Sequence, residues 1–119
     1  MTIIAELRKS LSRRIDMAML EYNTFQERFA ESPADAMIWS DSLFNAAARI
    51  DIYKGIIKRL DNEEDLEEII DAVERAINTA IRSQTCFSTS QTSNLYDVHK
   101  LKVLSDARET LVDWLEEME

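Results

Sequence analysis

Apolar side chains recur at alternating intervals of three and four residues along about the first thirty positions of the chain. At about 100° per residue, this spacing places them on one narrow stripe of a helix. The pattern therefore predicts a helix from about Thr2 to Glu31 with a single apolar face. Its members are Ile4, Leu7, Leu11, Ile15, Ala18, Tyr22, Phe25 and Phe29.

A second helix is predicted from Pro33 to Leu60, with Ser32 as its N-cap, and the short link makes the two helices an antiparallel hairpin. This helix carries apolar residues on two sides, so it is either the central helix of the fold or covered by a second subunit. We expect a homodimer. Gly55 is either tolerated here or marks a close helix crossing. The interface residues would be Met37, Phe44, Ala48, Ile52 and Ile56.

Two further helices follow. The third is predicted to start with residue 61 or 62 as its N-cap and to end at residue 86 or 87. The fourth is predicted to begin at residue 93 or 94 and to end near Met118. One Gly and one Pro in 119 residues are too few for sheets joined by tight turns. We therefore expect one domain, residues 1–119, of the all-α class: a four-helix antiparallel bundle with a long N-terminal helical hairpin.

Charge is distributed unevenly along the sequence. Residues 1–60 contain nine Lys or Arg and eight Asp or Glu, whereas residues 61–119 contain five and fifteen, which gives balances of +1 and −10 and the total of −9. An acidic half argues against nucleic acid or anionic lipid as a direct partner. It favours a protein partner with a basic surface.

The acidic residues of the third predicted helix are expected on the face opposite its apolar stripe. They are Glu64, Glu67, Glu68, Asp71 and Glu74. Over about 15 Å of helix they give one charge per about 3 Å, close to the ~3.4 Å spacing along one DNA strand. In composition, though in no motif, this resembles small phage and plasmid proteins that mimic DNA. The alternative is a solvated charged face.

Other polar residues point to binding less clearly. The Ser/Thr-rich stretch 88–93 is either an exposed connector or a partner-binding segment. Arg8, Lys9, Arg13 and Arg14 are spread around the first helix, and we expect them to pair with acids of the third or fourth helix, within one chain or between chains. A small-ligand site formed by Arg8, Arg14 and the connector is a further alternative.

Catalytic signatures are weak in this sequence. His99 is the sole imidazole, and Asp97, two residues before it, does not share its helix face. We find no Cys–His cluster, no Glu-x-x-His pair and no Gly-rich phosphate loop. We therefore expect no enzyme, no metal and no cofactor. A single Cys and no long apolar run favour a cytoplasmic protein without a membrane segment.

The combined prediction is a non-enzymatic protein-binding module. Its acidic helix face would occupy a basic surface of a partner protein, such as a nucleic-acid-binding surface, and would inhibit that partner. Alternatives are an assembly protein that oligomerises through the second apolar face of residues 33–60, and a helical bundle that binds a small ligand.

Overall fold

The computed structural model describes residues 3–31, 36–85 and 91–118, without the side chains of residues 29, 36–39, 83–85 and 91–97. The described residues form four helices and no strand: α1 (Ile3–Glu31), α2 (Ala36–Asp61), α3 (Leu66–Thr85) and α4 (Gln91–Met118). The predicted all-α class and the four-helix bundle are confirmed. The predicted N-cap Ser32, the start at Pro33 and the ends of the third helix at 86 or 87 lie outside the described residues.

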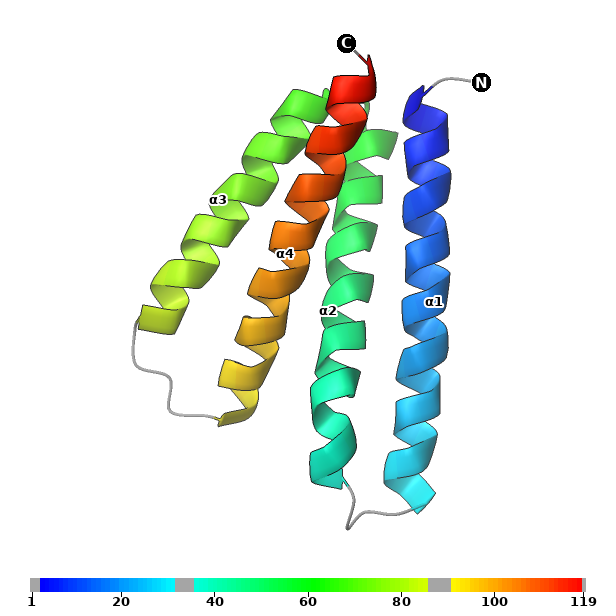
Figure 1. Cartoon of the computed structure of the whole chain (residues 1–119), viewed down its shortest axis with the longest axis vertical. Helices are drawn as coiled ribbons and strands as arrows, with labels where there is room; N and C mark the ends of the chain where they lie inside the picture. The colour runs from blue at the N-terminus through cyan, green and yellow to red at the C-terminus, as the bar shows by residue number, and fades with distance from the viewer. Residues whose placement is uncertain (1–2, 32–35, 86–90, 119) are drawn as a thin grey trace.

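The helices form two antiparallel hairpins that meet through α2 and α4. Figure 1 shows α1, α2 and α4 side by side, with α3 packed on the far side of α4. α2 and α4 run in the same direction, whereas α1 and α3 run in the opposite one. α1 barely touches α4, and α2 barely touches α3. The molecule is accordingly flattened, with extents of 50 × 33 × 21 Å.

Helix α2 is the central helix of this arrangement. Ala46 and Ala48 are both 0% exposed, although two residues along a helix point to nearly opposite sides. One of its apolar stripes contains Tyr53, which contacts Arg14 of α1. The other stripe contains Ile56, which lies with residues of α3 and α4 around one cleft. Both stripes are therefore covered within a single chain.

A single apolar core joins the four helices. Its buried members are Leu7, Leu11 and Ile15 of α1; Ala48, Tyr53, Ile56 and Leu60 of α2; Leu66, Ile69, Ile70, Val73 and Ala80 of α3; and Val103, Leu104, Ala107 and Leu111 of α4. The three-four pattern of the first thirty residues thus predicts the buried face of α1 correctly. The side chain of Phe29 lies outside the described part.

Gly55 does not mark a close helix crossing. A Cβ atom added at this position would meet nothing within 4 Å beyond its own helix backbone and chain neighbours. Gly55 is therefore tolerated in α2, and its backbone conformation has no positive φ that would require glycine.

Candidate functional site

The turn between α2 and α3 sets where the acidic segment begins. α2 continues to Asp61, and Glu63 then adopts a φ of 61°. The amide of Glu63 donates to the carbonyl of Leu60 at 3.0 Å, and that of Glu64 donates to the carbonyl of Arg59 at 3.2 Å. These two bonds form a Schellman motif, which usually has glycine at the position of Glu63.

Helix α3 begins three or four residues later than the sequence indicates. The carbonyl of Asp65 accepts the first helical bond, from the amide of Ile69 at 3.0 Å, so Asp65 occupies the N-cap position. The predicted N-cap at residue 61 or 62 is wrong, because Asp61 is the last residue of α2. Glu67 and Glu68 lie in the first turn of α3, where the helix dipole stabilises negative charge.

The five predicted acidic residues fall into two groups in the structure. Glu67, Glu68 and Asp71 are exposed on α3, and no salt bridge joins any of them to another described residue. Glu64 precedes the helix and pairs with Arg59 at 2.8 Å, while Glu74 pairs with Arg108 of α4 at 2.8 Å. The free part of the predicted face is therefore its middle.

A second acidic row lies on α4. Glu109, Asp113, Glu116 and Glu117 are all exposed. Their spacing of four and three residues places the first three on one helix face. The sequence analysis concentrated on the acidic residues of the third helix and did not use this spacing on the fourth.

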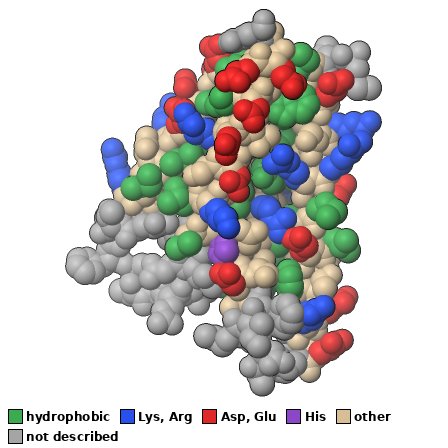
Figure 2. Space-filling view, viewed as in Figure 1, with side chains coloured by type: hydrophobic (Ala, Val, Ile, Leu, Met, Phe, Trp, Pro, Cys, Tyr) green, Lys and Arg blue, Asp and Glu red, His purple; other side chains and the backbone are tan. Residues whose placement is uncertain are grey.

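The ion pair between Glu74 and Arg108 fixes how the two rows lie. Because α3 and α4 are antiparallel, residues before Glu74 lie alongside residues after Arg108. Figure 2 shows acidic side chains gathered in the upper part of the molecule, where α3 begins and α4 ends. We call this surface the acidic end; its members are Glu67, Glu68 and Asp71 of α3 and Glu109, Asp113, Glu116 and Glu117 of α4.

The predicted oligomer interface has a different environment. Ala48 and Ile56 are 0% and 3% exposed within the single chain, and Ile52 packs against the core. Phe44 is half-buried, and the side chain of Met37 lies outside the described part. Because α2 is the central helix, its second apolar face is covered without a second subunit. The homodimer stays a prediction, but the second apolar face no longer supports it.

A polar cluster around the buried His99 joins α2 to α4, and the sequence analysis missed it. His99 donates from Nε2 to Asp41 Oδ1 at 2.6 Å, and its Nδ1 accepts from the Asn45 amide at 3.1 Å. Asp41 and Asn45 are four residues apart and therefore share one face of α2. They lie far from His99 in the sequence, so a search for partners among the neighbours of His99 could not find them. Both ring nitrogens are therefore engaged in hydrogen bonds to α2 in this arrangement.

Within the described part of this chain, no salt bridge joins Arg8, Lys9, Arg13 or Arg14 to an acid of α3 or α4, so the predicted pairing within the chain is wrong. Arg8 bonds to Asp61 of α2 at 2.8 Å, and this hydrogen bond holds the pKa of the Asp61 carboxyl below its ordinary value. Arg14 instead donates to two hydroxyls, Tyr53 Oη at 3.4 Å and Thr110 Oγ1 at 3.3 Å. Arg8 is therefore engaged at one end of the first hairpin, away from Arg14.

Comparison with known proteins finds no family model, no curated protein and no solved structure that matches this chain. Within the described residues, no three His, Cys, Asp or Glu side chains are grouped as metal ligands would be. None of the helices in this part of the chain combines the length and apolarity needed to cross a membrane. Residues 88–90 of the Ser/Thr-rich stretch lie outside the described part, and residues 91–93 belong to α4.

Proposed function

We propose that the chain is a non-catalytic protein-binding module whose acidic end occupies a basic surface of a partner protein. Where that surface normally binds nucleic acid, the module acts as an inhibitor of the phage or plasmid type. One observation carries the proposal: two exposed acidic rows from different helices meet at the same end of the bundle.

The arrangement of charge supports binding rather than a general solubilising role. Glu109 to Glu117 of α4 place four carboxylates along about 12 Å of helix, so that consecutive charges are on average about 4 Å apart. A DNA strand carries one charge per ~3.4 Å, so a protein surface that neutralises phosphates can accept such a row. A charged face that only keeps a protein soluble has no need to concentrate one sign, because interspersed charges of both signs serve as well.

Neutralising substitutions at the acidic end test the proposal. The variant Glu67→Gln, Glu68→Gln, Asp71→Asn removes three exposed negative charges and leaves the Glu74–Arg108 pair intact. A matched control, Asp16→Asn, Glu27→Gln, Glu31→Gln, removes three exposed charges from α1. Both proteins would be immobilised and used to capture partners from an extract of the cells that make the protein, at low salt, with mass spectrometry as readout.

The acidic-end variant should lose a protein that both the natural chain and the α1 control retain. Circular dichroism should show that both variants keep their helix content, because all six side chains are exposed. If both variants capture the same proteins as the natural chain, the acidic end is not a binding surface and the proposal fails. Equal loss by both variants would assign binding to net charge rather than to this surface.

A further inference from the structure

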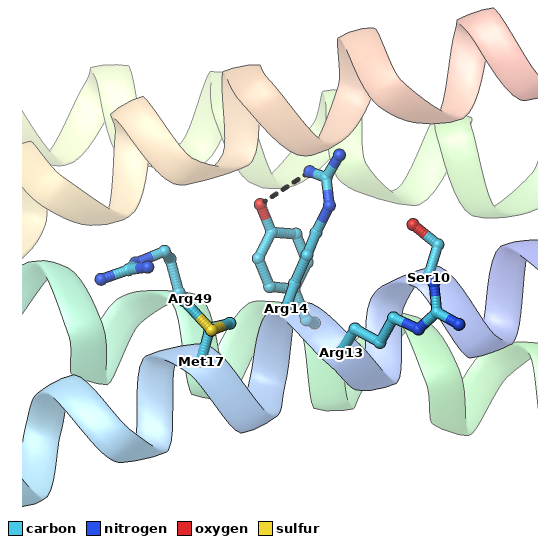
Figure 3. Close-up of a pocket in the computed structure, with 6 residues that line it drawn as sticks. Ser10, Arg13, Arg14, Met17 and Arg49 are labelled. Carbon is cyan, nitrogen blue, oxygen red and sulfur yellow. Dashed lines mark hydrogen bonds between the residues drawn. The ribbon is translucent and has the colours of Figure 1, made fainter.

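A cleft of about 390 Å³ opens beside α1, on a different surface from the acidic end. Small-molecule sites begin at about 300 Å³, so the volume suffices for a small ligand. Figure 3 shows that α1 and α2 both contribute to it. The guanidinium group of Arg14 lies over the ring of Tyr53. The lining residues are Ser10, Arg13, Arg14, Met17, Arg49 and Tyr53.

Arg14 is held in place by neutral groups alone. It donates to the hydroxyls of Tyr53 and Thr110, and its guanidinium carbon lies 5.7 Å from the centre of the Tyr53 ring. Tyr53 is 4% exposed, so this support is part of the core. No carboxylate of the described residues lies within 4.0 Å of Arg14, which leaves its positive charge uncompensated at short range.

Arg13 and Ser10 extend the same wall of the cleft. Ser10 lies three and four residues before Arg13 and Arg14, so the three side chains share one face of α1. Figure 3 shows Ser10 and Arg13 next to each other, beside Arg14. No salt bridge or hydrogen bond engages the side chains of Arg13 and Ser10 within the described part of the chain, whereas Arg8, Arg49, Arg59 and Arg108 each pair with a carboxylate.

The remaining lining residues limit what can bind. Arg49 pairs with Glu21, so its charge is compensated and it does not add a third free cation. In Figure 3 it lies beyond Met17, where it closes the cleft. Met17 is 58% exposed and offers an apolar surface beside the two cations. Asp106 lies one turn before Thr110, the α4 residue that bonds to Arg14, and its charge opposes a large or highly charged anion near Arg14.

We propose that this cleft binds a small oxyanion of the phosphate class between Arg13, Arg14 and the hydroxyl of Ser10. Guanidinium groups match the geometry of phosphate oxygens and bond to them with two parallel N–H groups. Two arginines, of which Arg14 is positioned by Tyr53 and Thr110, and a hydroxyl supply donors for three oxygens. An organic substituent on the phosphate would lie against Met17. The site is separate from the acidic end, so its test is independent of the proposed function.

Titration with inorganic phosphate and with phenyl phosphate tests this site. Binding would be followed by the amide and arginine Nε signals in NMR spectra at constant ionic strength. This residue-specific measurement is needed because helix N-termini also attract phosphate, and it distinguishes binding in the cleft from binding at a helix N-terminus. Inorganic phosphate should shift the signals of Ser10, Arg13 and Arg14 with a Kd on the order of 1 mM. Tighter binding of phenyl phosphate identifies an organic phosphate as the ligand, and equal binding identifies the free anion.

Four substitutions make the result decisive. Arg13→Gln breaks no bond of the fold and should weaken binding about tenfold, as should Arg14→Gln. Arg75→Gln, an exposed α3 arginine that no salt bridge engages in the described part, removes the same charge and should leave binding unchanged. Asp106→Asn removes a negative charge and should strengthen phosphate binding. The proposal is overturned if phosphate does not shift these signals, or if Arg13→Gln and Arg75→Gln have equal effects.

Discussion

Replacing Glu63 with glycine should stabilise the protein. Glu63 lies in the turn between α2 and α3 with a φ of 61°, in the left-handed region that residues with a Cβ atom occupy at a cost. Its amide and that of Glu64 complete the Schellman motif at the end of α2, so the conformation is fixed by the fold. Glycine adopts the same conformation without the steric penalty.

The size of the effect follows from two opposing terms. The left-handed conformation costs a residue with a Cβ atom about 1–2 kcal/mol, which Glu63→Gly removes. The greater freedom of glycine in the unfolded chain returns about 0.4–1 kcal/mol. The free energy of unfolding should therefore rise by about 0.5–1 kcal/mol. For a chain of this length, that is an increase of about 2–5 °C in Tm.

Chemical and thermal unfolding, followed by circular dichroism, measure this gain. Glu63→Ala is the matched control, because it removes the same charge and keeps the Cβ atom. The Ala variant should stay close to the natural protein, whereas the Gly variant should exceed it. Equal stability of the Gly and Ala variants would show that the turn does not hold position 63 in the left-handed conformation, and the reasoning would be refuted.

Three further predictions follow from α2 and its ends. Gly55→Ala should raise the free energy of unfolding by about 0.5–1 kcal/mol in urea denaturation, because the added methyl group meets open space. Ile56→Ala should lower the free energy of unfolding by about 2–5 kcal/mol, because Ile56 is 3% exposed. The urea midpoint should not depend on protein concentration. A midpoint that rises with concentration would mean that a second chain covers the face of α2 that contains Ile56. Asp61→Asn should destabilise the protein near neutral pH, because it removes the partner of Arg8. Since Arg8 lowers the pKa of Asp61, the difference in unfolding free energy between the natural chain and the variant should persist above pH 3.8 and vanish as the pH falls through the folded-state pKa. A difference that stays unchanged in acid would contradict the role of this pair.

Local periodicity was sufficient to predict most of the fold. The apolar stripe from Ile4 to Phe25 predicts the extent of α1 and its buried face, because helix burial repeats with the same spacing as the sequence pattern. The start of α3 was not predictable in this way. The end of α2 has Glu63 where helix ends commonly have glycine, so the usual stop signal is missing and the acids after Leu60 look like an N-terminus.

Tertiary pairing explains what the sequence could not show about the site. Exposure of Glu67, Glu68 and Asp71 follows from the apolar face on the other side of α3 and was predictable. The engagement of Glu74 depends on Arg108, which lies 34 residues away. The choice between a central α2 and a dimer depended on the order in which the helices pack, which short connections do not determine.

Salt dependence of partner binding tests the central claim about the acidic end most directly. The captured partner would be titrated with the natural chain and with the Glu67→Gln, Glu68→Gln, Asp71→Asn variant between about 50 and 200 mM salt, a range over which contacts between exposed charges lose strength. The natural chain should bind more weakly as salt increases, with a steep slope of log Kd against log salt concentration. The variant should bind more weakly at low salt and show a shallower slope. Affinity that does not change with salt, or equal slopes for the two proteins, would contradict binding through the acidic end.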